Sequence, residues 1–393
     1  MFIGSNLENV RSLNGLSRKE LSEKIAVSEQ AIWQYEVKNM MPEINKIYDI
    51  SKLFNVTTAY FINEQRNEFK EVSVDKHSIA FRAKNYKVST KMLNKQHSQA
   101  NYLSNLTSYL FSFVKMPVIS IMDLIDELDT FIMDSEETSR DLIIKQCANI
   151  SRNKLLSDKS NDQLLFQLEK SGIIVYEKHI NSDADAFSFW SDTELPFIIL
   201  GSNKGNAVRR VFDLAHELCH LLLHRYIQFD VLSADEYKAI EREANLFAAE
   251  FLLPEEEFVD DFNNLTKKSN PDQMMLLKEK WVVSIQAMGM RAYYLGLITD
   301  VQYRYFWASI NKKGYKKKEP LDESIQISKP VKINSLLDYF FRENLLSPEQ
   351  LLNDLKVEPQ FLSDIACIDN RILFKYMNTS KTKQHELITN LFR

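Results

Sequence analysis

The residues of this sequence best suited to shared chemistry lie in the run His216-Glu217-Leu218-Cys219-His220. The pattern from Val208 to His224 predicts one long helix, which places His216 and His220 on one face, about 40° apart around the axis. Two imidazoles at this spacing can bind one metal ion tetrahedrally and leave a position open for water. Glu217 is next to His216 and can take a proton from that water. The run therefore predicts a zinc site where water attacks a peptide carbonyl, with Glu217 as the general base that passes the proton to the leaving amine.

Other segments accompany this run along about residues 160 to 300. They are Asp185 to Ser188, Glu241 to Ala248 and Phe251 to Pro254. Together with His216 to His224 they resemble the ImmA/IrrE family of metallopeptidases. The resemblance implies a gluzincin-like site, in which two histidines and one glutamate hold zinc and another glutamate is the general base. On this chain it implies His216 and His220 as ligands, Glu217 as the base, and either Glu241 or Glu243 as the third ligand.

Helix geometry favours Glu241 over Glu243 as that third ligand. The segment from Glu241 predicts the start of a second helix that ends near Pro254. Glu241 shares a face with Ala244 and Ala248, and these small residues allow that face to lie close to the histidine helix. Glu243 points about 160° away, toward solvent or a neighbouring helix. We expect Glu241 to be the ligand and keep Glu243 as the alternative.

Residues 1–65 predict short, closely spaced helices. Ser17 and Glu20 predict a capping box, Ala26 lies in a tight turn, and Ser28 caps a second helix that runs to about Tyr35. Two short helices joined by such a turn form a helix-turn-helix. The segment resembles the Xre-type helix-turn-helix family at Gly15-Leu16-Ser17, Glu20-Leu21, Val27-Ser28, Ile32, Tyr35-Glu36 and Pro42. Ala26 stands where that family usually has glycine, so we expect a turn strained by about 1 kcal/mol.

The Xre resemblance implies that the second helix enters the major groove of double-stranded DNA at an operator. The residues expected in the groove are Glu29, Gln30, Trp33 and Gln34. Those expected at phosphates are Arg18, Lys19, Ser28 and Lys38. Glutamine can contact adenine with two hydrogen bonds, which favours Gln30 and Gln34 for base recognition. The alternatives are an exposed polar helix face, or a helix-turn-helix used for protein contacts only, because the domain is nearly charge-neutral.

The predicted elements indicate a mainly α chain with a small β-sheet, the α+β class. Strands are expected at Gly172 to Tyr176, Ala186 to Trp190 and Phe197 to Leu200. The expected domains are an all-α helix-turn-helix domain at 1–65, a helical linker region at 66–159, a gluzincin-like zinc peptidase domain at 160–320 and a C-terminal helical region of unknown role at 321–393. Short helices are expected in this last region at Ile333 to Phe341, Ser347 to Leu355 and Pro359 to Ala366.

Composition restricts the partners and the compartment. The formal charge of −5 argues against a chain-wide surface for polyanions. Three scattered cysteines are typical of a reducing compartment, not of a disulfide framework. No signal-peptide pattern opens the sequence, and the most apolar run, Tyr109 to Met122, is interrupted by Lys115 and Pro117 and is too short to span a bilayer. We expect a cytoplasmic protein with no membrane partner.

Two functions from different classes agree with these patterns. The first is a DNA-binding regulatory zinc metalloendopeptidase, and the family resemblance implies that its substrates are often DNA-bound repressors that control mobile elements, phage, toxin–antitoxin systems or stress responses. The second is an Xre-type transcriptional regulator or antitoxin whose zinc-peptidase fold senses or binds a partner without proteolysis. The intact set of His216, Glu217 and His220 favours the first, because binding alone does not require a general base. Xre-like domains often bind two-fold operators, so a homodimer is expected.

Overall fold

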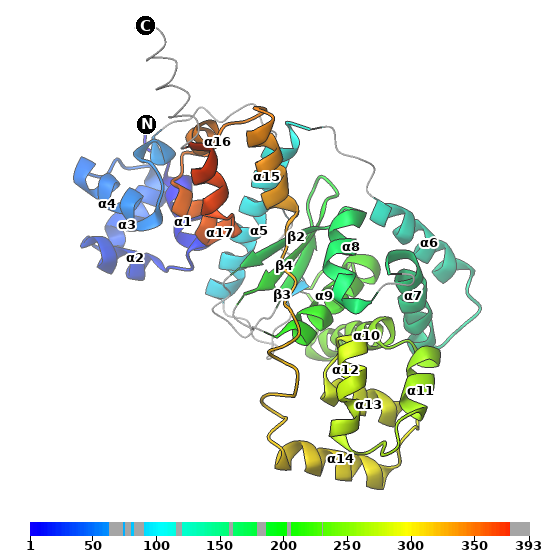
Figure 1. Cartoon of the computed structure of the whole chain (residues 1–393). Coiled ribbons are helices and arrows are strands. Elements are labelled where there is room, and N and C mark those ends of the chain that lie inside the picture. The colour runs from blue at the N-terminus through cyan, green and yellow to red at the C-terminus, as the bar shows by residue number, and fades with distance from the viewer. Residues whose placement is uncertain are drawn as a thin grey trace, which may run out of the picture.

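A computed structural model of the chain describes residues 1–62, 74, 80–81, 90–114, 120–156, 160–178, 186–202, 206–229 and 231–377. Helices make up most of these residues, and a small four-stranded sheet lies near the middle of the molecule (Figure 1). The expected class, mainly α with a small β-sheet, is confirmed. Within these residues no helix is both long and apolar enough to cross a membrane.

The sheet has the strand order β1-β3-β4-β2. Its strands are β1 (Ala80–Phe81), β2 (Ile174–Lys178), β3 (Ala186–Trp190) and β4 (Pro196–Gly201). Strand β2 runs parallel to β4, whereas β3 is antiparallel to β4 and β1 is antiparallel to β3. The three strands expected from the sequence are confirmed to within two residues at each end. Strand β1 was not predicted, because a two-residue strand leaves no alternating pattern in a sequence.

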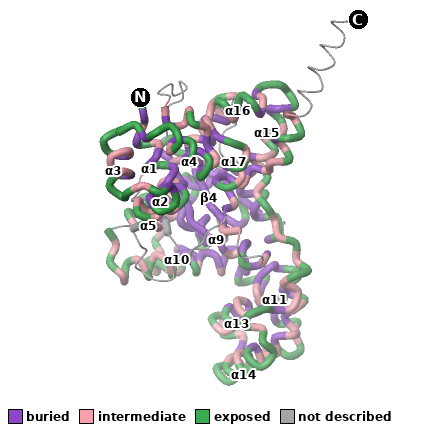
Figure 2. The backbone as a smooth tube through the Cα atoms, turned by 90° about the vertical axis from the view of Figure 1, so that its left-hand side faces the viewer, coloured by how far each residue is buried: buried purple, intermediate pink, exposed green. Residues whose placement is uncertain are grey.

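Both faces of this sheet are buried, and neighbouring residues of one strand enter different cores. Val175 and Ile198 belong to one apolar cluster, and Tyr176 and Ile199 belong to the other. Side chains alternate across a strand, so each strand must be apolar on both sides to fill two cores. Figure 2 shows this buried backbone around β4 and the helix beside it. The sheet therefore lies between two layers of helices, one packed on each face.

The first layer contains the residues with expected metal chemistry. Its helices are α6 (Ser120–Asp134), α7 (Arg140–Leu155), α8 (Leu164–Ser171), α9 (Ala207–Leu223), α10 (Ala234–Leu252), α11 (Glu255–Asn263), α12 (Met275–Trp281), α13 (Ile285–Tyr294) and α14 (Asp300–Lys312), with 3-10 turns η3 (Asn161–Gln163) and η4 (Pro271–Met274). Helix α9 packs against β3 and α10, and α10 packs in turn against α7. Helices α11 to α14 extend away from the sheet (Figure 1). The predicted helix from Val208 is confirmed, whereas α10 begins well before Glu241, at a capping box formed by Ser233 and Glu236.

The second layer begins with the helix-turn-helix. It contains α1 (Gly4–Leu13), α2 (Arg18–Ile25), α3 (Glu29–Lys38), α4 (Ile44–Phe54) and the 3-10 turn η1 (Thr58–Phe61). The predicted capping box of Ser17 and Glu20 is present, and Ser28 caps α3 by accepting a hydrogen bond from the backbone of Ala31. Ala26 ends α2 in the left-handed region at φ 52°, as its place at the usual glycine position predicted.

Helix α5 (Thr90–Phe111) and the C-terminal helices complete this layer. The latter are α15 (Lys332–Arg342), α16 (Pro348–Leu355) and α17 (Pro359–Ala366), close to the expected ranges. The backbone of Thr57 donates a hydrogen bond to Lys356, and that of Glu358 donates one to Asn55. Helix α17 contacts β2. Helices α16 and α17 thus lie beside the helix-turn-helix and join it to the sheet (Figure 1).

A buried cluster of charged side chains links helices α1, α2 and α3. The Glu36 carboxylate of α3 accepts hydrogen bonds from Arg11 of α1 at 2.5 and 3.0 Å and from Arg18 of α2 at 2.6 Å. The Glu36 side chain is fully buried. Removing one partner of a buried ion pair leaves the other charge without compensation, which is far more costly than losing an exposed pair. The orientation of α3 therefore depends on Glu36.

Replacing Glu36 with glutamine should lower the free energy of unfolding by about 3 kcal/mol or more, because Arg11 keeps its charge in a buried position. Urea denaturation followed by circular dichroism measures the change. Glu8→Gln is the matched control, since half-exposed Glu8 pairs with the same two arginines at 3.8 and 3.6 Å. It should cost less than about 1 kcal/mol. Equal losses for the two variants would show that the cluster does not hold the domain together.

Candidate functional site

Helix α9 places the two histidines and the glutamate of the predicted zinc motif inside the protein. Asn206 caps its start by accepting a hydrogen bond from the backbone of Val208 at 3.0 Å. His216 and Glu217 are fully buried, and His220 is 3% exposed. Ionisable groups buried in this way are costly unless each has a dedicated partner. The surroundings of these three residues therefore show what the site is built to hold.

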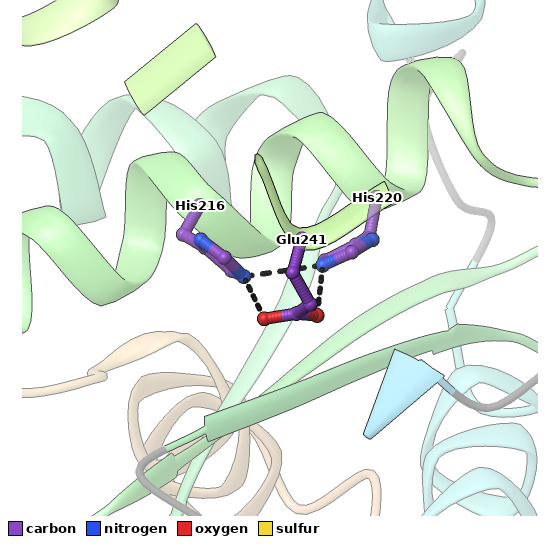
Figure 3. Close-up of side chains that lie close together, drawn as sticks. All are labelled: His216, His220 and Glu241. Atoms are coloured by element: carbon purple, nitrogen blue, oxygen red, sulfur yellow. Dashed lines mark hydrogen bonds and ion pairs between the residues drawn. The ribbon is translucent and has the colours of Figure 1, made fainter. Parts of the chain in front are cut away.

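The two histidines meet Glu241 of α10, and we call these three residues the metal triad (Figure 3). His216 Nε2 lies 3.5 Å from one carboxylate oxygen of Glu241, and His220 Nε2 lies 3.5 Å from the other. The two Nε2 atoms are 3.2 Å apart. All three ligand atoms fall within 4.8 Å of one another.

The spacing and chemistry of the metal triad fit a zinc ion. Donors in a tetrahedral zinc site with bonds of about 2.0–2.1 Å stand roughly 3.3 Å apart. The two Nε2 atoms are 3.2 Å apart, and each lies 3.5 Å from a different oxygen of the Glu241 carboxylate. Two imidazole nitrogens and one carboxylate form the ligand set of a catalytic zinc site with a fourth position left open. The residues present are therefore those such an ion requires.

The surroundings of Glu241 favour its ionised form. Burial by itself raises the pKa of this carboxyl, but hydrogen bonds and charge interactions with His216 and His220 outweigh burial and hold the pKa below its usual range. A carboxyl group must be ionised to bind a metal ion. Ala244 and Ala248 are fully buried on the same helix, which lets α10 lie close to α9. Asn245, one turn after Glu241, is exposed.

Glu217 faces the sheet and is held by Ser188 of β3. The Ser188 hydroxyl donates a hydrogen bond of 2.7 Å to one Glu217 carboxylate oxygen. This contact was not predicted, although Ser188 belongs to one of the segments that carry the family resemblance. The available signal was a serine inside the apolar strand Ala186 to Trp190. The hydroxyl fixes the direction of the carboxylate beside the metal triad.

Glu243 lies away from the metal triad. Its carboxylate accepts hydrogen bonds of 3.0 and 2.8 Å from Arg140 of α7 and lies 3.2 Å from His224 Nε2. Burial raises the pKa of Glu243, but the contacts with His224 and Arg140 outweigh burial and lower it to about 2. Of the two candidate glutamates, Glu241 lies beside His216 and His220. Glu243 lies beside His224 and Arg140 instead.

The residues expected to contact DNA surround the exposed face of α3. Ile32 and Glu36 point into the domain. The exposed members of the expected set are Lys19, Ser28, Glu29, Gln30, Trp33 and Lys38, and Gln34 is half-buried. Lys38 Nζ lies 5.5 Å from the centre of the Trp33 ring. Arg18 is about one-third exposed, and its guanidinium is hydrogen-bonded to Glu36, so it already has a structural role.

Comparison with known families agrees with both parts of the chain. The sequence model of a helix-turn-helix domain matches residues 4–65, and that of the IrrE N-terminal-like domain, peptidase family M78, matches residues 168–293. The chain has the ImmA/IrrE architecture with an N-terminal helix-turn-helix domain. No curated protein matches it. The segment matched by the peptidase-family model includes the metal triad, Glu217 and Ser188.

Metal content measured by elemental mass spectrometry tests whether the metal triad binds zinc. After incubation with excess zinc and desalting, the wild type should retain about one zinc per chain, because all three donors are in place. His220→Ala and Glu241→Ala should lose it, and Glu243→Ala should retain it. Loss with Glu243→Ala but not with Glu241→Ala would identify Glu243 as the ligand. A folded wild type without metal would contradict the centre altogether.

Proposed function

We propose that this chain is a zinc-dependent metalloendopeptidase that its helix-turn-helix domain brings to DNA, where it cleaves a repressor or another regulatory protein. The observation that carries the proposal is the convergence of His216, His220 and Glu241, with Glu217 next to His216 along α9. The proposed location is the cytoplasm, in agreement with the scattered cysteines. The sequence resemblance to ImmA/IrrE metallopeptidases supports a regulatory protein as the substrate.

The geometry supports general-base catalysis by Glu217. Zinc held by the metal triad supplies a Lewis acid and lowers the pKa of water to about 7. Glu217 takes the proton of the attacking water, and it gives this proton to the amine that leaves when the peptide bond breaks. Ser188 keeps the carboxylate oriented during both transfers through its hydrogen bond of 2.7 Å. Burial of Glu217 excludes bulk water from the step.

The edge of β3 is the place where an extended substrate would lie. Peptides often bind by adding a strand to a sheet edge. In this structure β1 pairs with that edge, and Ala80 stands opposite Ser188, the partner of Glu217. The edge beside the general base therefore accepts extended backbone. On this proposal, a substrate chain that binds in the same way takes the place of β1.

The exposed face of α3 supports DNA as the second partner. Gln30 and Trp33 point away from the domain core, as a helix that enters the major groove requires. Two copies of such a domain bind a two-fold operator, so a homodimer is part of the proposal. DNA binding would concentrate the peptidase beside proteins that occupy neighbouring sites.

Replacing Glu217 with glutamine should lower kcat by about 10²-fold or more, because the amide cannot take a proton. The measurement is cleavage of a cell-derived peptide library, with new N-termini identified by mass spectrometry. Zinc content and circular dichroism should stay at wild-type values. Glu279→Gln, at an exposed position of α12, should cleave like the wild type. Wild-type function of Glu217→Gln in cells would favour the alternative, a regulator that binds partners without proteolysis.

Selection from a random duplex library should yield a preferred sequence for the wild type. Gln30→Ala should lose about 1–3 kcal/mol of discrimination at one base pair, because a two-bond contact with a base disappears. Lys19→Ala should weaken binding to all sequences and reduce the salt dependence by about one phosphate contact. Lys312→Ala, on α14, is the control and should change neither. Selection that yields no preferred sequence would favour a helix-turn-helix used only for protein contacts.

A further inference from the structure

A line of contacts connects the metal triad to helix α7. His220 Nδ1 lies 3.0 Å from His224 Nδ1, on the side of the imidazole opposite the triad. His224 Nε2 lies 3.2 Å from a carboxylate oxygen of Glu243, and Glu243 accepts two hydrogen bonds from Arg140. His224 is only 1% exposed. We call His224, Glu243 and Arg140 the relay.

The chemistry of the relay fixes the direction of its hydrogen bonds. Arginine has only donors and an ionised carboxylate has only acceptors. Glu243 therefore needs a proton on His224 Nε2. Neutral His224 then has a lone pair on Nδ1, which accepts a hydrogen bond from the Nδ1–H of His220. His220 in this tautomer presents the lone pair of Nε2 to the metal triad, as a zinc ligand must.

The opposite direction is unfavourable at the carboxylate. If neutral His224 donated from Nδ1 to His220, its Nε2 lone pair would face a carboxylate oxygen of Glu243 at 3.2 Å. Two acceptors at that distance repel each other, and the buried carboxylate would lose one of its donors. Arg140 holds Glu243 from the other side with two hydrogen bonds, so the carboxylate cannot turn away without losing them. The tautomer of His220 is thus set from α7.

We propose that His224, Glu243 and Arg140 are positioning residues of the metal centre, which hold His220 in its ligating tautomer and raise the affinity for zinc. The proposal rests on the proposed function, because it takes the metal triad to bind zinc. It extends the centre to α7, since Arg140 lies outside the residues 168–293 matched by the peptidase family. Partners of this kind orient ligand imidazoles, and their loss weakens metal binding by about 10- to 100-fold.

The test is zinc affinity, which needs no substrate. Metal-free full-length protein competes for zinc with a chromophoric chelator, and the absorbance gives the dissociation constant. His224→Leu and Glu243→Gln should each bind zinc about 10- to 100-fold more weakly than the wild type, although both should still take up zinc supplied in excess, since the three ligands remain. His224→Asn should retain more zinc affinity than His224→Leu, because the side-chain oxygen of asparagine can accept a hydrogen bond from the Nδ1–H of His220.

Arg242→Ala separates the relay from simple docking of the helices. Arg242 of α10 pairs with Asp141 of α7 at 2.6 and 3.0 Å, beside the pair of Glu243 and Arg140. Its loss removes one ion pair between the same helices and leaves the relay intact. Arg242→Ala should bind zinc as tightly as the wild type, whereas Arg140→Ala should bind it more weakly. Equal weakening by these two variants would assign the effect to helix docking and overturn the proposal.

Nitrogen NMR of the zinc-loaded protein labelled at histidine gives an independent readout. His224 should carry its proton on Nε2 and His220 should carry its proton on Nδ1. A proton on His224 Nδ1 would overturn the proposal, as would wild-type zinc affinity in both His224→Leu and Glu243→Gln. A wild type that binds no zinc would instead contradict the proposed function, so the two failures are distinguishable.

Discussion

Burial of the central sheet on both faces is the constraint that places every other part of this molecule. Strands β2 and β4 alternate between two apolar cores, so helices must cover both sides of the sheet. One side receives α9 and its metal-binding residues. The other receives the helix-turn-helix, α5 and the C-terminal helices, which are joined to one another by backbone hydrogen bonds between residues 55–57 and 356–358. The layer with the helix-turn-helix and the layer with α9 therefore pack on opposite faces of the same sheet.

The same burial determines the chemistry of the candidate centre. Helix α9 lies between the sheet and α10, so His216, Glu217 and His220 lose almost all contact with solvent. Specific partners then face them: the Glu241 carboxylate lies near both imidazole Nε2 atoms, and the Ser188 hydroxyl donates a hydrogen bond to Glu217. Low local polarity strengthens each of these contacts and makes an unmatched group costly. The close hydrogen-bond and charge contacts at the centre are therefore a consequence of its burial from solvent.

The sequence predicted features that depend on residues close together along the chain. Helix periodicity placed His216 and His220 on one face, and the 160° offset from Glu243 favoured Glu241, which the structure brings to the histidines. The partners in contacts between distant residues could not be identified from the sequence. Ser188 meets Glu217 across 29 positions, and Arg140 meets Glu243 across 103. The pairing of β1 with β3 and the packing of the C-terminal helices depend on the assembled fold in the same way.

The shared sheet also bears on how DNA binding and proteolysis would be combined. Tyr176 of β2 contacts the hydroxyl of Thr107 on α5 at 3.0 Å, and Val175, the preceding residue, packs in the core that holds α9. Rotating the helix-turn-helix layer away from the sheet would expose one entire apolar core to water. The layer that carries the exposed face of α3 is therefore packed on the same sheet as the layer that carries the metal triad. If the proposed function holds, binding to an operator determines which way the centre faces, and proteins at suitably placed neighbouring sites become its preferred substrates.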